Sequence, residues 1–226
     1  SVLRKNPNIS FAKGKSPINY NNNTGKIYAK GKEAFLRSFL RTNYISGLIY
    51  RTDLFHNLNI YSWIASQIQT NYAVRSYSHS CFSALYALHG DYLEDNVLLF
   101  IEGNAEKDSR TTNINLSTPK RILTYATVES RIAQHNGFIE ILNQLSINLD
   151  KDTYIQAYKF LCIKSFYLMS LVKQQYLNIN ANWINIMTDI SNCCVDGILK
   201  LNRPLTKEEQ NEIVYHVYTN FNYFTE

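Results

Sequence analysis

The chain has 226 residues, of which 45% are hydrophobic, so it is long enough to bury a substantial core. Its 8 glycines and 4 prolines are too few for an all-β protein with many tight turns. The formal net charge of +5 is unevenly placed, because residues 1–51 hold ten basic residues and one acid. The rest of the chain is mildly acidic, and this asymmetry favours an anionic partner.

Residues 1–31 have little apolar periodicity and are rich in Asn, Lys, Gly and Ser. This composition predicts a basic, largely irregular N-terminal arm. Bases stack on aromatic rings while Lys and Arg neutralise phosphates, so a mixture of tyrosines and lysines is typical of nucleic-acid binding. The alternative is a solvated tail. The candidate nucleic-acid-binding residues of the arm are Lys13, Lys15, Tyr20, Lys26, Tyr28 and Lys30.

Residues 32–226 are expected to form one helical domain, because apolar residues recur at three- and four-residue steps. Its first helix begins near Lys32 and has a basic face that adds Lys32, Arg37 and Arg41 to the candidate nucleic-acid surface. Residues 44–50 either continue this helix or form a short strand. The next helices are predicted over 53–70, 72–89 and 92–102, followed by a polar surface loop at 104–117.

The most apolar helical stretch covers residues 153–176 and predicts a central core helix roughly 36 Å long. Either Asp150 or Asp152 can cap its N-terminus. Lys159 and Lys164 interrupt the apolar run, so the stretch does not predict a membrane span and no transmembrane segment is expected.

Helix signals also flank this central segment. Thr118 followed by Pro119 predicts a helix start, and a capping box from Thr206 to Glu209 predicts the start of the last helix. Another apolar face covers residues 182–200. With about seven helices and no convincing strand, the sequence predicts an all-α fold, a multi-helix globular domain preceded by the basic arm.

The four cysteines show no CxxC spacing or disulfide framework, which favours a reducing, cytoplasmic compartment. His79 and Cys81 lie close in sequence, but residues two apart on a helix point away from each other. With His89 they do not form a standard zinc spacing. Glu94 and Asp95 are assigned to a helix start, where carboxylates stabilise the helix dipole. We therefore predict no catalytic residue, metal or cofactor.

Two Arg–His pairs keep an enzymatic alternative open. The spacing from Arg51 to His56 is similar to the loose Arg-to-His pattern of HEPN-type helical ribonucleases. Arg131 and His135 lie one helical turn apart, where they could share a phosphate. The resemblance implies a ribonuclease whose site is assembled from Arg and His on separate helices.

The function expected first is a non-enzymatic binding or assembly protein. Its basic N-terminal region would contact nucleic acid or an acidic protein partner, and its helical body would form a homo-oligomer or join a larger complex. The alternatives are the helical ribonuclease and a protein-facing subunit of a larger complex that binds free nucleic acid poorly.

Overall fold

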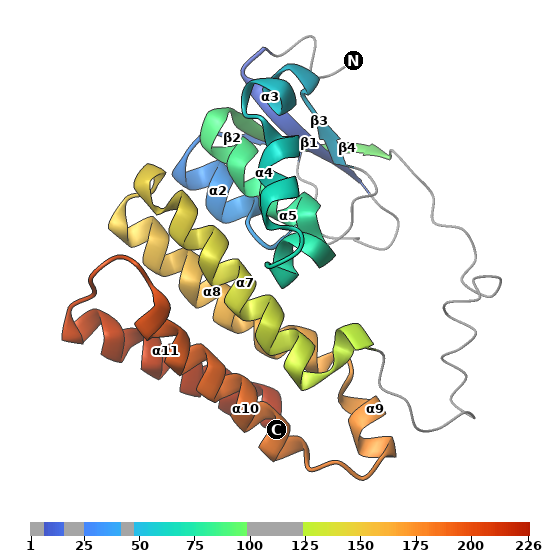
Figure 1. Ribbon diagram of the computed structural model, residues 1–226, viewed down its shortest axis with the longest axis vertical. Helices are drawn as coiled ribbons and strands as arrows, with labels where there is room; N and C mark the ends of the chain where they lie inside the picture. Colours follow the sequence, from blue (N-terminus) through green and yellow to red (C-terminus); the bar gives the residue numbers. More distant parts are fainter. Residues whose placement is uncertain (1–6, 16–24, 42–47, 99–123) are drawn as a thin grey trace, which may run out of the picture. The chain divides into compact units, whose positions relative to one another are not determined.

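The computed structural model describes residues 7–15, 25–41, 48–98 and 124–226, and the chain divides into two compact units. Unit 1 comprises residues 1–102 and 140–157, and unit 2 comprises residues 103–139 and 158–226. Helices α7 (Val128–Leu145) and α8 (Lys151–Ser170) each contribute to both units (Figure 1). The fold is mainly helical, as predicted, but unit 1 also contains a four-stranded sheet, so all-α is too narrow a class.

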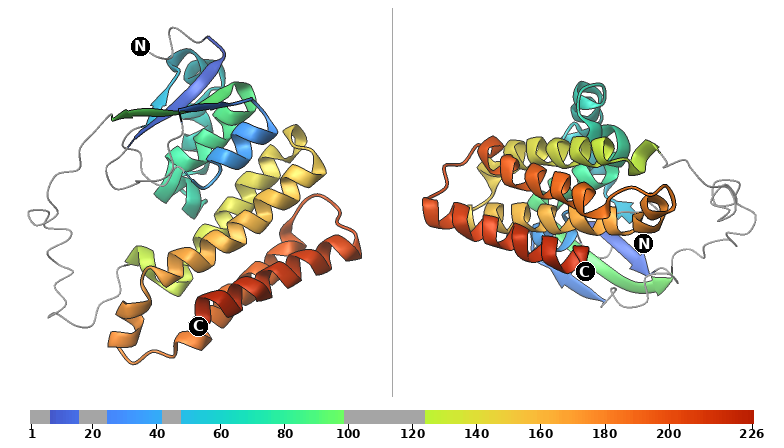
Figure 2. Two further views of the ribbon diagram at one scale, coloured as in Figure 1. Left: turned by 180° about the vertical axis from the view of Figure 1, so that it is seen from behind. Right: turned by 90° about the horizontal axis from the view of Figure 1, so that it is seen from below.

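Unit 1 combines this sheet with helices, and α2 and α5 lie against one of its faces (Figure 2). Its strands run in the order β2-β4-β1-β3, with β4 parallel to β1 and the two outer pairings antiparallel. The elements before α7 are β1 (Ile9–Lys15), β2 (Lys26–Tyr28), α2 (Lys32–Ser38), β3 (Leu48–Tyr50), α3 (Thr52–Asn57), α4 (Ile60–Gln67), α5 (Tyr72–His89) and β4 (Asp91–Leu98).

The sheet corrects two predictions. Residues 9–15 and 26–28 were expected in an irregular arm, but they form β1 and β2. Residues 92–102 were expected to be helical, but their described part belongs to β4. A short apolar run cannot be assigned to helix or strand from its own periodicity, because the strand is defined by pairing with a distant segment. At 48–50 the structure has the strand alternative.

A row of aromatic rings crosses the sheet, one ring from each strand. Tyr28 stacks on Tyr92 with 5.9 Å between ring centroids, Tyr92 on Phe11 at 4.5 Å, and Phe11 on Tyr50 at 5.7 Å. Each neighbouring pair is also a register pair in the sheet. Tyr86 of α5 packs against Phe11 and Tyr50, so this row forms the core between sheet and helix.

The helices of unit 1 are shorter than predicted, except for α5. The segment 53–70 is divided into α3 and α4 at Asn59, whose φ of 49° lies in the left-handed region. The helix predicted from Lys32 ends at Ser38. Helix α5 covers 72–89 as expected, with the Asn71 side chain accepting a hydrogen bond from the Val74 backbone N–H at its start. The predicted loop at 104–117 lies outside the described residues.

Unit 2 is helical throughout its described part. Helices α10 and α11 pack side by side (Figure 2). Besides α7 and α8, the elements of the second half of the chain are η2 (Thr124–Ala126), η3 (Ser146–Asn148), α9 (Lys173–Asn178), α10 (Trp183–Asp196), η4 (Gly197–Lys200) and α11 (Lys207–Thr225). Of these, η3 belongs to unit 1. The predicted capping box of α11 is confirmed, with Thr206 and Glu209 each accepting from the other's backbone N–H.

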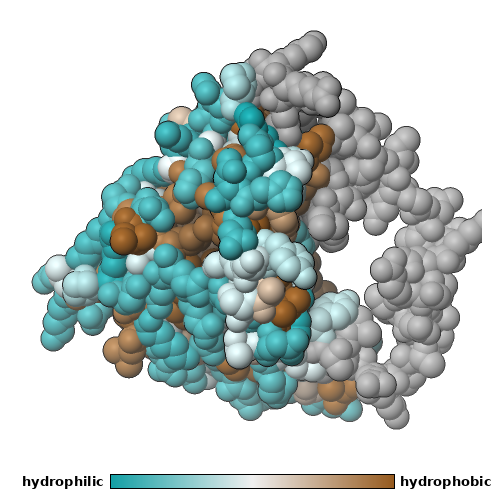
Figure 3. All heavy atoms as spheres, turned by 45° about the horizontal axis from the view of Figure 1, so that its top comes forward, coloured by the Kyte–Doolittle hydropathy of each residue, from teal (hydrophilic) through white to brown (hydrophobic). Residues whose placement is uncertain are grey.

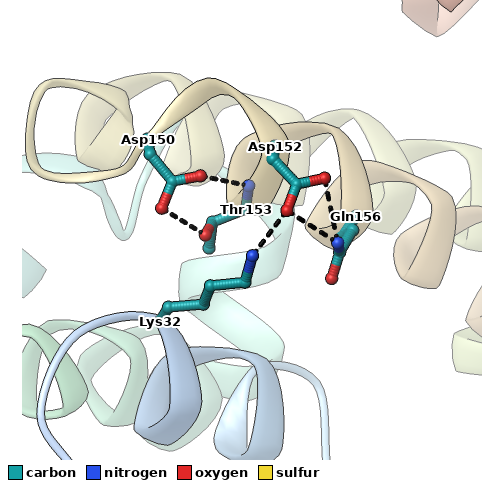
Figure 4. Close-up of polar contacts among 5 residues, drawn as sticks. All are labelled: Lys32, Asp150, Asp152, Thr153 and Gln156. Atoms are coloured by element: carbon teal, nitrogen blue, oxygen red, sulfur yellow. Dashed lines mark hydrogen bonds and ion pairs between the residues drawn. The ribbon is translucent and has the colours of Figure 1, made fainter.

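The predicted central helix is confirmed over most of its length but ends earlier. Helix α8 stops at Ser170, and Val172 has a non-helical φ of −113° before α9 begins. Asp150 is the cap, because its carboxylate accepts from the backbone N–H and the hydroxyl of Thr153, both at 2.7 Å (Figure 4). Tyr158 and Cys162, which lie at helical spacing in this predicted core helix, are both buried.

Hydrophilic residues predominate on the described surface that Figure 3 shows, and hydrophobic residues lie among them in separate patches. Leu199 and Ile147 are the most exposed of the large apolar side chains described, at 85% and 84%. None of the helices in the described ranges has the length and hydropathy needed to cross a bilayer.

Tight packing around Gly197, at the junction of α10 and η4, gives a first prediction. A Cβ atom at this position would overlap the hydroxyl of Tyr158 and approach Ile139 Cδ1 to 2.9 Å. We expect Gly197→Ala to lower the free energy of unfolding by about 1–3 kcal/mol, because a buried tyrosine must move. Urea unfolding measures the change. The exposed Leu199→Ala in η4 is the control and should cost about 0.5 kcal/mol or less.

Candidate functional site

A row of charged residues lies one step along the strands from the aromatic row. Glu94 on β4 is paired in register with Lys26 on β2 and with Lys13 on β1. Side chains two residues apart on a strand share a face, so this row continues the face that carries the aromatic rings. Arg37 of α2 and Arg41 approach the same carboxylate. We call Lys13, Lys26, Arg37 and Arg41, with Glu94 and Tyr28, the basic cluster.

Glu94 organises the basic cluster from a nearly buried position, with 4% of the residue exposed. Arg37 donates two hydrogen bonds to its carboxylate, from Nε to Oε1 at 2.9 Å and from Nη2 to Oε2 at 2.7 Å. The hydroxyls of Tyr92 and Tyr28 donate to the same carboxylate at 3.3 and 3.5 Å. The hydrogen bond to Glu94 raises the pKa of Arg37. This bidentate pair joins α2 to the sheet.

Tyr28 stands at the end of the aromatic row and is only half-buried. The Lys26 Nζ atom lies 5.0 Å from its ring centroid, and the Arg37 Cζ atom lies 5.3 Å from it. Both distances are within the range of cation–π attraction. The tyrosine therefore presents an aromatic surface with two cations beside it.

Lys13 and Arg41 show that positive charge is concentrated here. Burial lowers the pKa of Lys13, and the nearby guanidinium groups of Arg37 and Arg41 lower it further, while Glu94 acts in the opposite direction. Burial and the charge of Arg37 likewise lower the pKa of Arg41. Lys13 Nζ donates to the Arg41 carbonyl oxygen at 3.4 Å. An anion placed beside these groups would relieve their mutual repulsion.

The remaining candidate residues are placed differently. Lys32 forms an ion pair with Asp152 of α8, with Nζ and Oδ2 2.5 Å apart (Figure 4). Lys30 is exposed, and its backbone N–H donates to Asp91 Oδ1 at 2.9 Å. The side chain of Lys15 and all of Tyr20 lie outside the described residues. The structure thus brings together Lys13, Lys26, Tyr28, Arg37 and Arg41 out of the predicted set.

Glu94 was missed as a site residue because it was assigned to a helix start. That role is wrong, since Glu94 lies within β4. The one signal in the sequence that fits its actual place is the alternation of Tyr92 and Glu94, which puts both side chains on one face of a strand.

The residues of the ribonuclease alternative have other partners. Arg51 pairs with Asp53, with Nη2 and Oδ2 2.6 Å apart, and also donates to the Pro7 carbonyl oxygen. The ring of His56 packs edge-on against Phe55. His56 belongs to unit 1 and His135 to unit 2. The alternative that the chain is a ribonuclease stays a prediction.

His135 is buried in unit 2, with 2% of the residue exposed. Its Nδ1 atom is 2.8 Å from the Ser165 hydroxyl oxygen. Burial, with a contribution from Lys200, lowers its pKa to about 3, so the imidazole is neutral near pH 7. Arg131, one turn earlier, is also buried and donates to Gln134 at 2.8 Å.

A second group of chemically active side chains lies around this histidine. A ring nitrogen of His135 and the sulfur atoms of Cys162 and Cys194 all lie within 4.8 Å of one another. All three residues are buried. Sequence spacing could not reveal this group, because its members come from α7, α8 and α10. By contrast, Cys81 is a core residue of α5, and burial raises the pKa of its thiol.

Comparison of the chain with protein-family models, with curated proteins and with solved structures finds no match. Inference about function therefore rests on the two side-chain groups, which lie in different units.

The near-burial of Glu94 gives a second prediction. We expect Glu94→Gln to lower the free energy of unfolding by about 2–3 kcal/mol, because the charges of Arg37 and Lys13 would lose their carboxylate. Chemical denaturation measures this loss. Asp53→Asn is the matched control, since the Arg51–Asp53 pair is more exposed, with 27% and 54% of the two side chains accessible. That variant should lower the free energy of unfolding by about 0.5 kcal/mol or less. Equal losses in the two variants would contradict the role of Glu94 as the buried partner of Arg37 and Lys13.

Proposed function

We propose that unit 1 binds single-stranded nucleic acid through the basic cluster, without chemical catalysis. The observation that carries this proposal is the arrangement of a half-buried tyrosine and four cations around Glu94, with Lys26 beside it in register and the other three cations acting on its carboxylate. Lys13, Lys26, Arg37 and Arg41 with Glu94 have a combined formal charge of +3, from four positive groups and one negative group. A phosphate backbone supplies repeated negative charges that complement such a surface.

The groups of the basic cluster are suited to different parts of a nucleotide. Lys26 and Arg41 are exposed, so both can reach phosphates. When the Lys26 ammonium leaves the Tyr28 ring for a phosphate, it uncovers a ring on which a base can stack. Arg37 is held by Glu94 in a fixed orientation beside this ring. The carboxylate thus positions the cation instead of cancelling the whole cluster.

Tyr28 favours nucleic acid over an acidic protein partner. A carboxylate-rich peptide would use the cations alone, whereas a base also uses an aromatic surface. Lys15, Tyr20 and Lys30 belong to the same N-terminal segment and are further candidates for contact. Binding of this kind depends weakly on sequence and strongly on ionic strength.

The test measures fluorescence anisotropy of labelled single-stranded RNA and DNA with the full chain, over a series of salt concentrations. We expect the double variant Lys26→Gln/Arg41→Gln to bind more weakly. Loss of two phosphate contacts should reduce the slope of log affinity against log salt by about 1.4, at roughly 0.7 per contact for a single strand. Tyr28→Leu should weaken binding with little change in slope, because it removes stacking but no charge.

The matched control is Arg75→Gln/Lys207→Gln, which removes one Arg and one Lys from exposed positions on α5 and α11. It should leave affinity and slope near those of the unaltered chain. Equal weakening by both double variants would mean that net charge alone matters and would refute a defined site. Absence of binding by the unaltered chain at low salt would also refute the proposal and redirect attention to an acidic protein partner.

A further inference from the structure

We infer that unit 2 contains a zinc-binding site formed by His135 of α7, Cys162 of α8 and Cys194 of α10. One nitrogen and two sulfur atoms from these residues lie within 4.8 Å of one another, and the residues are 2%, 0% and 0% exposed. Imidazole nitrogen and thiolate sulfur are the ligand types that Zn²⁺ prefers. This site lies outside the basic cluster and does not depend on the proposed nucleic-acid function.

The hydrogen bonds of His135 leave its ring ready to coordinate a metal. The Ser165 hydroxyl donates to the Leu161 carbonyl oxygen at 3.0 Å, so its single hydrogen is already committed. In the tautomer that this arrangement favours, His135 Nδ1–H donates to Ser165 Oγ and Nε2 carries the lone pair. Metal-binding histidines are typically oriented in this way, with the second ring nitrogen donating to a nearby oxygen.

The Nε2 atom of His135 is the second sign of a ligand. It is fully buried and has no hydrogen-bond partner among the residues that the structure describes. A buried acceptor without a partner is costly, so native proteins rarely leave one. A zinc ion bound to Nε2 would use this lone pair, since the nitrogen is a neutral two-electron donor.

The charges of the three ligands also suit a buried zinc ion. Two cysteine thiolates and one neutral imidazole balance the +2 charge of Zn²⁺, so the complete site is formally neutral. Binding releases two protons, one from each thiol, and no electron is transferred. Burial and contact with the Cys162 thiol raise the pKa of the Cys194 thiol, so metal binding competes with a proton at this sulfur. A neutral complex avoids the cost of an isolated charge in the core of unit 2.

The geometry requires only a small contraction. Zn–S bonds of about 2.3 Å in a tetrahedron place two sulfur atoms about 3.8 Å apart. The donor atoms lie within 4.8 Å of one another, so side-chain rotations that move them about 1 Å closer suffice. A small hollow lined by His135, Ser165, Arg131 and Lys164 lies beside the histidine.

The first experiment measures metal binding to the unaltered full chain, purified and kept under reducing conditions. We expect one zinc per chain by elemental analysis after dialysis. Replacement of the bound zinc by Co²⁺ should give an absorption spectrum with thiolate-to-cobalt charge-transfer bands and the intense d–d bands of tetrahedral cobalt. Release of two protons per ion bound would fit the two thiols. Retention of no zinc, or a cobalt spectrum without charge-transfer bands, overturns the inference.

Variants then locate the site. Cys162→Ala and Cys194→Ala should each abolish the cobalt charge-transfer bands and reduce bound zinc from one per chain to near zero. Cys193→Ala is the matched control, because Cys193 is also buried and adjacent to Cys194 but lies outside the three-residue group. The Cys193→Ala variant should keep both the bound zinc and the cobalt charge-transfer bands. Equal loss in all three variants, or zinc retained in Cys194→Ala, contradicts the assignment, and circular dichroism checks that each variant is folded.

Discussion

The carboxylate of Glu94 lies nearly buried on a central strand, and a buried negative charge must be neutralised by a partner. In unit 1 that partner is Arg37, whose two hydrogen bonds to Glu94 attach α2 to the sheet. Because β2 and β1 flank β4, Lys26 and Lys13 lie in register on either side of Glu94. One acid therefore gathers more positive charge than it neutralises, and the surplus makes the surface suitable for an anion.

The parts of the fold that the sequence predicted well are those whose signals are local. The cap at Asp150, the capping box at Thr206 and the length of α5 each depend on residues within one helix. Strand β4 was mistaken for a helix because its stability comes from pairing with β1, about 80 residues earlier. Likewise, β1 lies in a polar, basic segment, and it is ordered because it pairs with β3 and β4 and buries Ile9, Phe11 and Ala12.

The two side-chain groups differ in how far sequence could predict them. The cations of the basic cluster are concentrated near the N-terminus, so composition alone pointed to Lys13, Lys26, Arg37 and Arg41. Their arrangement around Glu94 could not be foreseen without the sheet. His135, Cys162 and Cys194 each sit on an apolar helix face, where a single Cys or His looks like an ordinary core residue. Only the packing of three helices shows that their donor atoms converge.

Hydrogen bonds hold buried polar groups in both units. In unit 1, Glu94 accepts hydrogen bonds from Arg37, Tyr28 and Tyr92. In unit 2, the hydroxyl of Tyr158 donates to the Cys194 carbonyl oxygen and Ser165 fixes the His135 ring, while Nε2 of that ring has no partner in the described part of the chain. An unmet buried acceptor costs about 1–3 kcal/mol. A zinc ion bound at the site that we infer would give this nitrogen a partner and remove that cost.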